Sequence, residues 1–227
     1  MNKIIFYKDG GIFNKIESLM NTDMIKYKKA YVLQKMTEMP VEEKTALFSM
    51  IAKKQIEDID TTKQARQFEI MVNALTSAGF EHYEISNFAM PGGRSKHNSN
   101  YWNQVPYLGL GPAAHSFNGD QRQWNIANNS LYFQSLKNSL VPFELENLSL
   151  TQKFNEYMMI SLRKSEAFST HYIKTHFGEK YEAYIMSTTP KYIALGQLEP
   201  TEQGYTLTKE AKFFADGIAS DFFWVNE

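Results

Sequence analysis

The chain of 227 residues contains no cysteine. Disulfides, thiolate zinc sites and cysteine-ligated iron–sulfur clusters all need cysteine sulfur, so the chain cannot form any of them from its own residues. A charge excess of one sign is missing too, because 24 Lys and Arg stand against 25 Asp and Glu, for a net charge of −1. No global field therefore attracts nucleic acid or anionic membranes.

Long apolar runs are also missing. No stretch approaches the roughly 18 consecutive apolar residues of a membrane span, and the N-terminus shows no signal-peptide pattern. We therefore expect a cytoplasmic protein without a transmembrane segment. What is present is a 43% share of hydrophobic residues. That share is enough to bury a core in one large domain or in two small ones.

The middle of the chain predicts an α/β arrangement, whereas residues 1–40 show no clear pattern. From Thr61, apolar residues at helical spacing predict a helix that ends at Gly79. A strand is predicted over residues 80–88, with Tyr83, Ile85 and Asn87 on one face. A helix followed by a strand is the unit of a parallel sheet.

The last third of the chain is mainly helical. Ser149 and Gln152 form a capping box at the start of a first helix. Two further helices are predicted over residues 170–177 and 179–195, the second interrupted at Pro190.

A hairpin and a closing helix complete this region. Residues 198–199 and 205–207 are expected to pair, and Thr208 is expected to cap the last helix. The residues expected to face the core from that helix are Ala211, Phe214, Ala215, Ile218 and Phe222. Helices, a hairpin and a closing helix predict a small winged-helix-like domain over residues 150–227.

Between these regions, residues 90–129 are rich in glycine and proline and are expected to be irregular. So long an irregular segment in a compact domain usually serves binding. A neutral imidazole at His97 can ligate haem iron, and the rings of Tyr101 and Trp102 can stack on a porphyrin. Arg94 and Lys96 can meet the propionates. Alternatively, His97 caps a loop and Trp102 packs inside.

Three other features are open to two interpretations. The run from Gly109 to Ala114 is a poor dinucleotide fingerprint, and its small residues are better explained by close approach of the backbone to a ligand or strand. Glu84 either needs a polar partner inside the fold or faces solvent on an edge strand. The group of Arg122, Trp124 and Asn125 is either a surface turn or, as only the family resemblance given below implies, a brace near a pocket.

Two linked motifs carry a resemblance to a known family. The matching residues are His97, Asn98, Tyr101 and Trp102 in H-N-x-x-Y-W, and Gly109, Gly111, Ala114, His115 and Ser116 in G-x-G-x-x-A-H-S. With these motifs and the run LGQLEPTEQGYTLTKEAKFFADGIASDFF, residues 41–227 resemble the C-terminal part of the radical-SAM coproporphyrinogen III oxidase-like family. Within that family, they resemble the haem-chaperone (HemW-type) branch.

The resemblance implies a fold and a set of sites. The fold class is α/β (α+β), with the end of a partial (β/α) barrel over residues 41–145 and a winged-helix-like, HemN C-terminal-type domain over residues 150–227. The first motif is associated with haem binding, with His97 as iron ligand. The second motif, including Gly109, Gly111, Ala114 and His115, borders the S-adenosylmethionine pocket of the family.

One departure from the family limits the chemistry. Family members carry C-x-x-x-C-x-x-C, whose thiolates hold a [4Fe–4S] cluster that binds S-adenosylmethionine, and this chain has no cysteine. The chain therefore resembles an amino-terminally shortened member. We do not expect it to hold the cluster or S-adenosylmethionine, and radical catalysis by this chain alone is excluded. Loss of early barrel strands would expose an edge, so we expect either self-association through residues 83–88 or a poorly ordered segment before residue 60.

Three functions remain to be compared. The leading hypothesis is the C-terminal portion of a haem chaperone that binds haem and docks to a recipient protein. The alternative is a subunit or fragment of an oxygen-independent coproporphyrinogen III oxidase in porphyrin biosynthesis, with the cluster supplied by another polypeptide. Nucleic-acid binding by the winged-helix-like region is disfavoured, because residues 151–227 carry eight Lys or Arg against ten Asp or Glu.

Overall fold

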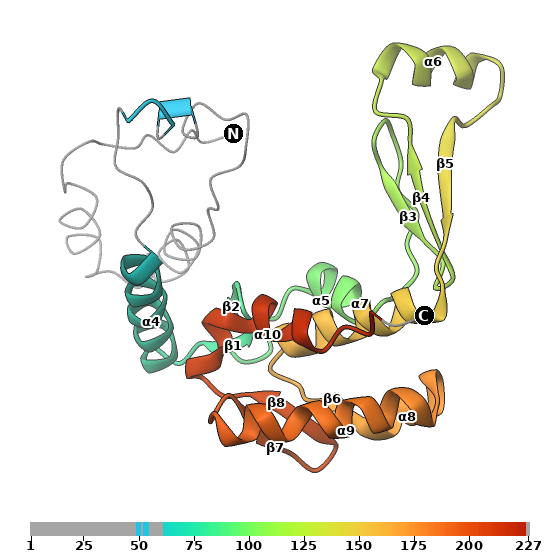
Figure 1. Cartoon of the computed structure of the whole chain (residues 1–227). Coiled ribbons are helices and arrows are strands. Elements are labelled where there is room, and N and C mark those ends of the chain that lie inside the picture. Colours follow the sequence, from blue (N-terminus) through green and yellow to red (C-terminus); the bar gives the residue numbers. More distant parts are fainter. Residues whose placement is uncertain (1–48, 51, 55–60, 226–227) are drawn as a thin grey trace. The chain divides into compact units, whose positions relative to one another are not determined.

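The computed structural model describes residues 49–50, 52–54 and 61–225 (Figure 1). The described residues separate into two compact units. The first contains those up to His82 together with Ser86–Gly92, and the second contains Tyr83–Ile85 together with those from Gly93 onward. The predictions for residues 1–40 lie outside the described residues. No helix in the described ranges has the length and apolar content to cross a membrane.

In the first unit, the predicted helix is confirmed as α4 (Thr61–Ser77). Its apolar positions at helical spacing are buried, with Met71 only 1% exposed. Gly79 follows with a φ of +86°, the left-handed conformation that favours glycine after a helix. The ring of His82 then stacks on that of Phe88, 4.2 Å between centroids.

The single strand predicted over residues 80–88 is wrong. The chain instead forms β1 (Glu81–Glu84), a turn, and β2 (Asn87–Ala89), and the two strands form a small sheet. The interruption has a tertiary cause, because the Ile85 amide donates to the Arg163 carbonyl oxygen at 3.0 Å. The Tyr83 carbonyl oxygen in turn accepts from the Ser165 amide at 3.1 Å.

The segment expected to be irregular, residues 90–129, contains regular structure. It holds α5 (Lys96–Trp102), β3 (His115–Phe117) and β4 (Gln121–Asn125). After α6 (Asn129–Lys137) comes β5 (Phe143–Asn147), which completes an antiparallel sheet of order β3-β4-β5. Figure 1 shows α6 at one end of this sheet.

The C-terminal helices and hairpin agree closely with the sequence. The capping box of Ser149 and Gln152 opens α7 (Leu150–Arg163), which is followed by α8 (Thr170–Phe177) and α9 (Glu179–Ala194). Pro190 lies inside α9, which continues past it, so the expected interruption is wrong. The hairpin is confirmed as β7 (Leu198–Pro200) and β8 (Gly204–Leu207).

A third strand that the sequence did not indicate joins this hairpin. β6 (Phe168–Ser169) pairs with β8, so the sheet order is β6-β8-β7. The chain ends in η2 (Glu210–Phe214) and α10 (Ala215–Asp221). The winged-helix-like assignment and the domain boundary near residue 150 stay predictions.

The core of the second unit lies among α7, α9, α10 and this sheet. Its fully buried side chains include Phe154, Met158, Phe168, Ile185 and Phe222. Four of the five residues expected to face inward from the last helix do so, but Phe214 is 55% exposed. Thr208 does not cap that helix with its side chain, because its hydroxyl donates to the Gly196 carbonyl oxygen at 2.9 Å.

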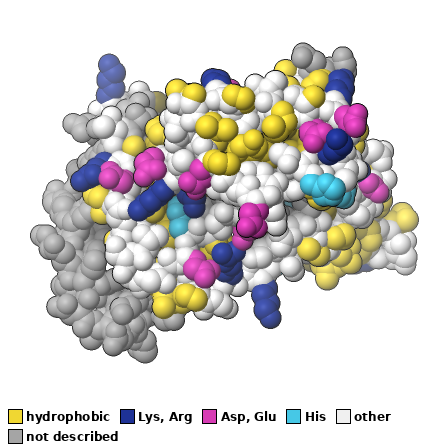
Figure 2. All heavy atoms as spheres, turned by 90° about the horizontal axis from the view of Figure 1, so that it is seen from below, with side chains coloured by type: hydrophobic (Ala, Val, Ile, Leu, Met, Phe, Trp, Pro, Cys, Tyr) yellow, Lys and Arg dark blue, Asp and Glu magenta, His cyan; other side chains and the backbone are white. Residues whose placement is uncertain are grey.

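Acidic and basic side chains are mixed over the surface of the molecule shown in Figure 2. Lys and Arg lie between Asp and Glu on this face, with hydrophobic patches among them, and they do not merge into a basic patch. A continuous basic footprint is what phosphate neutralisation needs. This face therefore gives no support to nucleic-acid binding.

Candidate functional site around helix α5

Helix α5 carries the first sequence motif, so His97 lies in a helix and not in the loop that the sequence predicted. Ser95 is the N-cap, and its hydroxyl oxygen accepts from the Asn98 amide at 3.2 Å. At the other end, the Asn103 amide donates to the Ser99 carbonyl oxygen at 2.9 Å. A helix of seven residues is marginal alone. Its caps and tertiary contacts must therefore fix the direction of its side chains.

The two ends of α5 are also tied to other elements of the same unit. The Ser95 amide donates to the Tyr83 hydroxyl at 3.4 Å, and the Lys164 ammonium donates to Asn103 Oδ1 at 3.1 Å. The helix is therefore held between β1 and the end of α7.

The motif residues point to opposite sides of α5. Successive residues of an α-helix are about 100° apart, so His97 and Tyr101 share one face while Ser99 and Trp102 share the other. The contacts agree: the rings of His97 and Tyr101 meet edge to face at 4.9 Å, whereas Ser99 and Trp102 line a separate cavity. We refer to these as the His97 face and the Trp102 face.

On the His97 face, aromatic rings continue away from the exposed imidazole. The Tyr101 and Tyr107 rings are 4.8 Å apart and nearly perpendicular, and Phe117 follows 6.2 Å beyond Tyr107. A small cavity of about 90 Å³ lies beside them and is also lined by Arg122. Burial raises the pKa of the Tyr107 hydroxyl, and the neighbouring Tyr101 adds to this rise while Arg122 opposes it.

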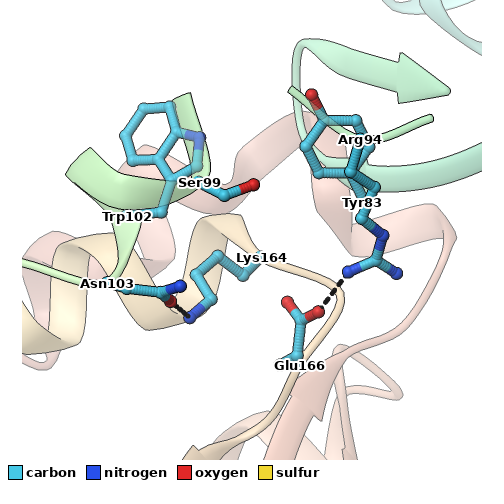
Figure 3. A pocket seen from close by; sticks show the side chains of 7 residues that line it. All are labelled: Tyr83, Arg94, Ser99, Trp102, Asn103, Lys164 and Glu166. Atoms are coloured by element: carbon cyan, nitrogen blue, oxygen red, sulfur yellow. Dashed lines mark hydrogen bonds and ion pairs between the residues drawn. The ribbon is translucent and has the colours of Figure 1, made fainter. Parts of the chain in front are cut away.

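On the Trp102 face, a cavity of about 290 Å³ opens between α5 and the segment that follows α7 (Figure 3). Its lining residues come from three places in the chain: Tyr83, Arg94, Ser99, Trp102, Asn103, Lys164 and Glu166. Arg94 pairs with Glu166 at 2.5 Å, and its guanidinium carbon lies 5.3 Å from the centre of the Tyr83 ring. Burial raises the pKa of Glu166, but the hydrogen bond and charge of Arg94, a backbone hydrogen bond and the charge of Lys164 outweigh it, so this pKa lies below its usual value.

One polar atom in this cavity wall has no partner. The indole nitrogen of Trp102 is buried and finds no hydrogen-bond acceptor among the described residues. Indole N–H is a donor only, and buried donors in folded proteins are nearly always satisfied.

A buried ion pair fixes the wall that carries Tyr83 and Lys164. Glu84 is fully buried, and its carboxylate accepts from Arg163 Nε at 3.0 Å. Arg163 also pairs with Asp216 at 2.5 Å. Burial lowers the pKa of Arg163, but the two carboxylates outweigh this and raise it. Of the two interpretations of Glu84, the solvent-facing one is therefore wrong.

The second motif forms a loop braced against β3 and β4. A Cβ atom on Gly109 would lie 2.1 Å from the His115 carbonyl oxygen, so the predicted close approach of backbone is confirmed here. The Gly109 amide donates to the Ser116 hydroxyl at 3.0 Å, and Asn125 Nδ2 donates to the Gly111 carbonyl oxygen at 2.9 Å. Asn125 is buried, which supports the bracing interpretation over a surface turn.

The neighbours of Asn125 on β4 are tied to other elements. Arg122 forms an ion pair with Glu156 of α7, and the indole nitrogen of Trp124 donates to Glu144 of β5 at 3.1 Å. His115 is exposed, with its ring 6.4 Å from that of Trp124. Gly109, Gly111, Ala114 and His115 thus belong to one loop-and-strand segment. Their role toward a cofactor stays a prediction.

The residues that the sequence predicts to contact haem therefore do not lie together in the structure. Of the six haem candidates, His97 and Tyr101 share a face, and Lys96 is exposed at the start of α5. Trp102 and Arg94 line the other cavity, and the Asn98 amide closes the N-terminal cap. Lys164 and Glu166 were missed, because only the tertiary fold brings them to residues some 70 positions earlier.

Comparison with known proteins relates the chain to haem chaperones and radical-SAM proteins. No family model matches the chain. It is 26% identical over 183 residues to "Heme chaperone HemW" of Bacillus subtilis, covering 80% of this chain and 48% of that protein. It is 31% identical over 165 residues to "Heme chaperone HemW" of Lactococcus lactis, covering 69% of this chain and 43% of that protein.

A solved structure resembles the chain as well. Escherichia coli coproporphyrinogen III oxidase (HemN), described as a radical SAM enzyme, superposes with a TM-score of 0.57 and 16% identity over 87% of this chain and 51% of that one. At this identity the likeness shows the fold alone. The chain spans about half the length of the curated relatives it matches.

Proposed function

Because the chain belongs to the HemN/HemW-like family and corresponds to its C-terminal part, we propose that it binds haem on the His97 face of α5. In this proposal the chain is the C-terminal portion of a haem chaperone, and haem is its cargo. Relatives that match most of the chain are named heme chaperones. The mixed helix-and-sheet fold resembles that of HemN, which agrees with membership of the family but does not distinguish a chaperone from an oxidase.

The observation that carries the proposal is the exposed imidazole of His97 set edge-on against Tyr101. A neutral imidazole ligates haem iron through one ring nitrogen. The rings of Tyr101 and Tyr107 supply aromatic surface beside it, which suits a flat apolar macrocycle. Lys96, the residue before His97, supplies a positive charge for a propionate.

The site is open. Pockets that enclose a drug-sized ligand measure roughly 300–1,000 Å³, and the cavity beside Tyr101 measures about 90 Å³. Haem bound at His97 would therefore lie against the surface with one side exposed. An exposed macrocycle can be passed to a second protein, so we propose that a haem-requiring recipient docks over this face.

The family's cluster does not fit this chain. A [4Fe–4S] cluster needs thiolates, and the chain has none, so no step of the proposed function passes through it. We propose that Gly109, Gly111, Ala114 and His115 border the S-adenosylmethionine site only in a complete family member. The coproporphyrinogen oxidase alternative would need the thiolates from another polypeptide.

The predicted self-association concerns the strand edge at residues 83–88. Two backbone hydrogen bonds, one between Tyr83 and Ser165 and one between Ile85 and Arg163, already occupy part of the edge at residues 83–88. A second copy would therefore compete with the end of α7, and self-association there stays a prediction. A cytoplasmic location also stays a prediction.

A haemin titration tests the proposal. The Soret band should shift and saturate with the unaltered chain, and His97→Ala should weaken binding at least tenfold. Lys96→Met should weaken it by a smaller factor. His171→Ala is the matched control, because His171 is also exposed but lies on α8. Equal binding by the His97→Ala and His171→Ala variants would exclude the His97 face.

A further inference from the structure

The cavity on the Trp102 face has features of a second binding site, and the haem proposal uses none of them. The first is the buried Trp102 indole N–H, which has no acceptor among the described residues. In Figure 3 the indole nitrogen lies on the edge of the ring turned toward Ser99 and Tyr83. A bound acceptor in the cavity would satisfy this donor.

The second feature is a positive charge that no carboxylate balances at contact distance. Arg94 is paired with Glu166 at 2.5 Å. The Lys164 ammonium contacts only the neutral amide oxygen of Asn103, at 3.1 Å, and forms no ion pair within the part of the chain that the structure describes. Since an ammonium group has three donors, Lys164 keeps two for a ligand.

The net charge of the cavity and the aromatic rings in its walls indicate which class of ligand fits. The cavity lining carries the positive charges of Arg94 and Lys164, both of which act on the negative charge of Glu166, so its net charge is one positive and matches a single negative charge. A phosphate dianion would face the carboxylate of Glu166, which disfavours it. The rings of Tyr83 and Trp102 form apolar walls that suit an organic body better than a bare inorganic ion.

We propose that this cavity binds the carboxylate of a small organic monoanion. Lys164 is the counter-ion, and the Trp102 indole N–H donates to a carboxylate oxygen. The Ser99 hydroxyl lines the same cavity and supplies a second neutral donor. A volume of about 290 Å³ suits a small acid, near the lower end of the range for ligand pockets. The site lies on the side of α5 opposite His97, so the inference does not depend on haem binding.

Indole N–H resonances in a ¹⁵N-correlation NMR spectrum test the proposal. The chain has three tryptophans, and Trp102→Phe identifies the resonance of Trp102 by its loss. Titration with sodium benzoate or sodium propionate at constant ionic strength should shift this resonance in a saturable way. The resonances of Trp124 and Trp224 should stay unchanged, which also reports that the fold is intact.

Two lysine variants make the test specific. Lys164→Met should weaken benzoate binding at least tenfold, whereas Lys96→Met, which removes an exposed lysine of α5 outside the cavity, should leave it within twofold. The proposal is overturned if sodium chloride shifts the Trp102 resonance equally, or if inorganic phosphate binds as tightly as benzoate. It is also overturned if Lys164→Met binds benzoate like the unaltered chain. Because the readout is an indole resonance, failure here leaves the haem result unaffected.

Discussion

Replacing Arg163 with methionine should destabilise the second unit strongly. The side chain of Glu84 is only 1% exposed, and Arg163 forms an ion pair with its carboxylate at 3.0 Å. Removing one partner of a buried ion pair costs about 3–5 kcal/mol, because the remaining charge stays in a low-dielectric site. The ion pair of Arg163 with the 63%-exposed Asp216 adds at most about 1 kcal/mol.

Urea unfolding measures this loss. With a slope of roughly 2 kcal/mol per molar urea, a loss of 3–5 kcal/mol lowers the midpoint by about 1.5–2.5 M. Arg66→Met is the matched control, because Arg66 pairs with Glu69 on α4 with both side chains more than half exposed. The control should lower stability by less than about 1 kcal/mol.

A double variant separates the charge from the packing. Glu84→Met combined with Arg163→Met removes both charges, and well-packed apolar replacements of a buried pair are often close to neutral. The double variant should therefore be more stable than Arg163→Met alone. If Arg163→Met loses no more stability than Arg66→Met, then Glu84 does not depend on Arg163 and the buried-pair argument fails.

Three further predictions concern the backbone, a helix cap and pH. Gly109→Ala should destabilise by about 1–3 kcal/mol in thermal unfolding, because its Cβ would meet a backbone oxygen of β3 at 2.1 Å; Gly217→Ala, inside α10 with nothing within 4 Å, should instead stabilise by about 0.5–1 kcal/mol. Ser95→Ala should cost about 1 kcal/mol and weaken haemin binding, because it removes the cap that orients α5; unchanged haemin affinity would contradict this. The folded-state pKa of Glu166 lies below its ordinary value of 4.5, so its contribution to stability is complete above about pH 5 and is lost as the pH falls through the folded-state pKa. Arg94→Met should reduce this acid-induced loss, and an unchanged pH profile of urea midpoints would refute it.

Long helices with clear caps could be predicted from the sequence. The apolar spacing after Thr61 and the capping box at Ser149 are local signals, and both helices form. The bounds predicted for residues 170–177 agree with α8 residue for residue. In these segments, local propensity and tertiary packing favour the same structure.

Short elements could not be predicted, because tertiary contacts fix them. Helix α5 has no fully buried residue in its seven positions, so apolar periodicity could not reveal it, although Ser95 is a normal N-cap. β6 has two residues and exists by pairing with β8. The turn at Ile85 follows from its bond to the end of α7.

The candidate site was predicted in part for the same reason. The motif identified His97 and Tyr101, which lie together on one face of α5. The sequence motif alone did not show that Trp102 lies on the opposite face. The second cavity joins Arg94 to Lys164 and Glu166, which lie far apart in the sequence and meet only in the fold.

The central claim is that the imidazole of His97 ligates haem iron, and electron paramagnetic resonance of the ferric haem adduct tests it most directly. The unaltered chain and the His171→Ala variant, both prepared with ¹⁵N-labelled histidine, should give the same spectrum, broadened by hyperfine coupling to the labelled ring nitrogen that binds the iron. His97→Ala should lose that broadening and bind haem more weakly. An identical spectrum from His97→Ala would place the iron on another ligand and contradict the account.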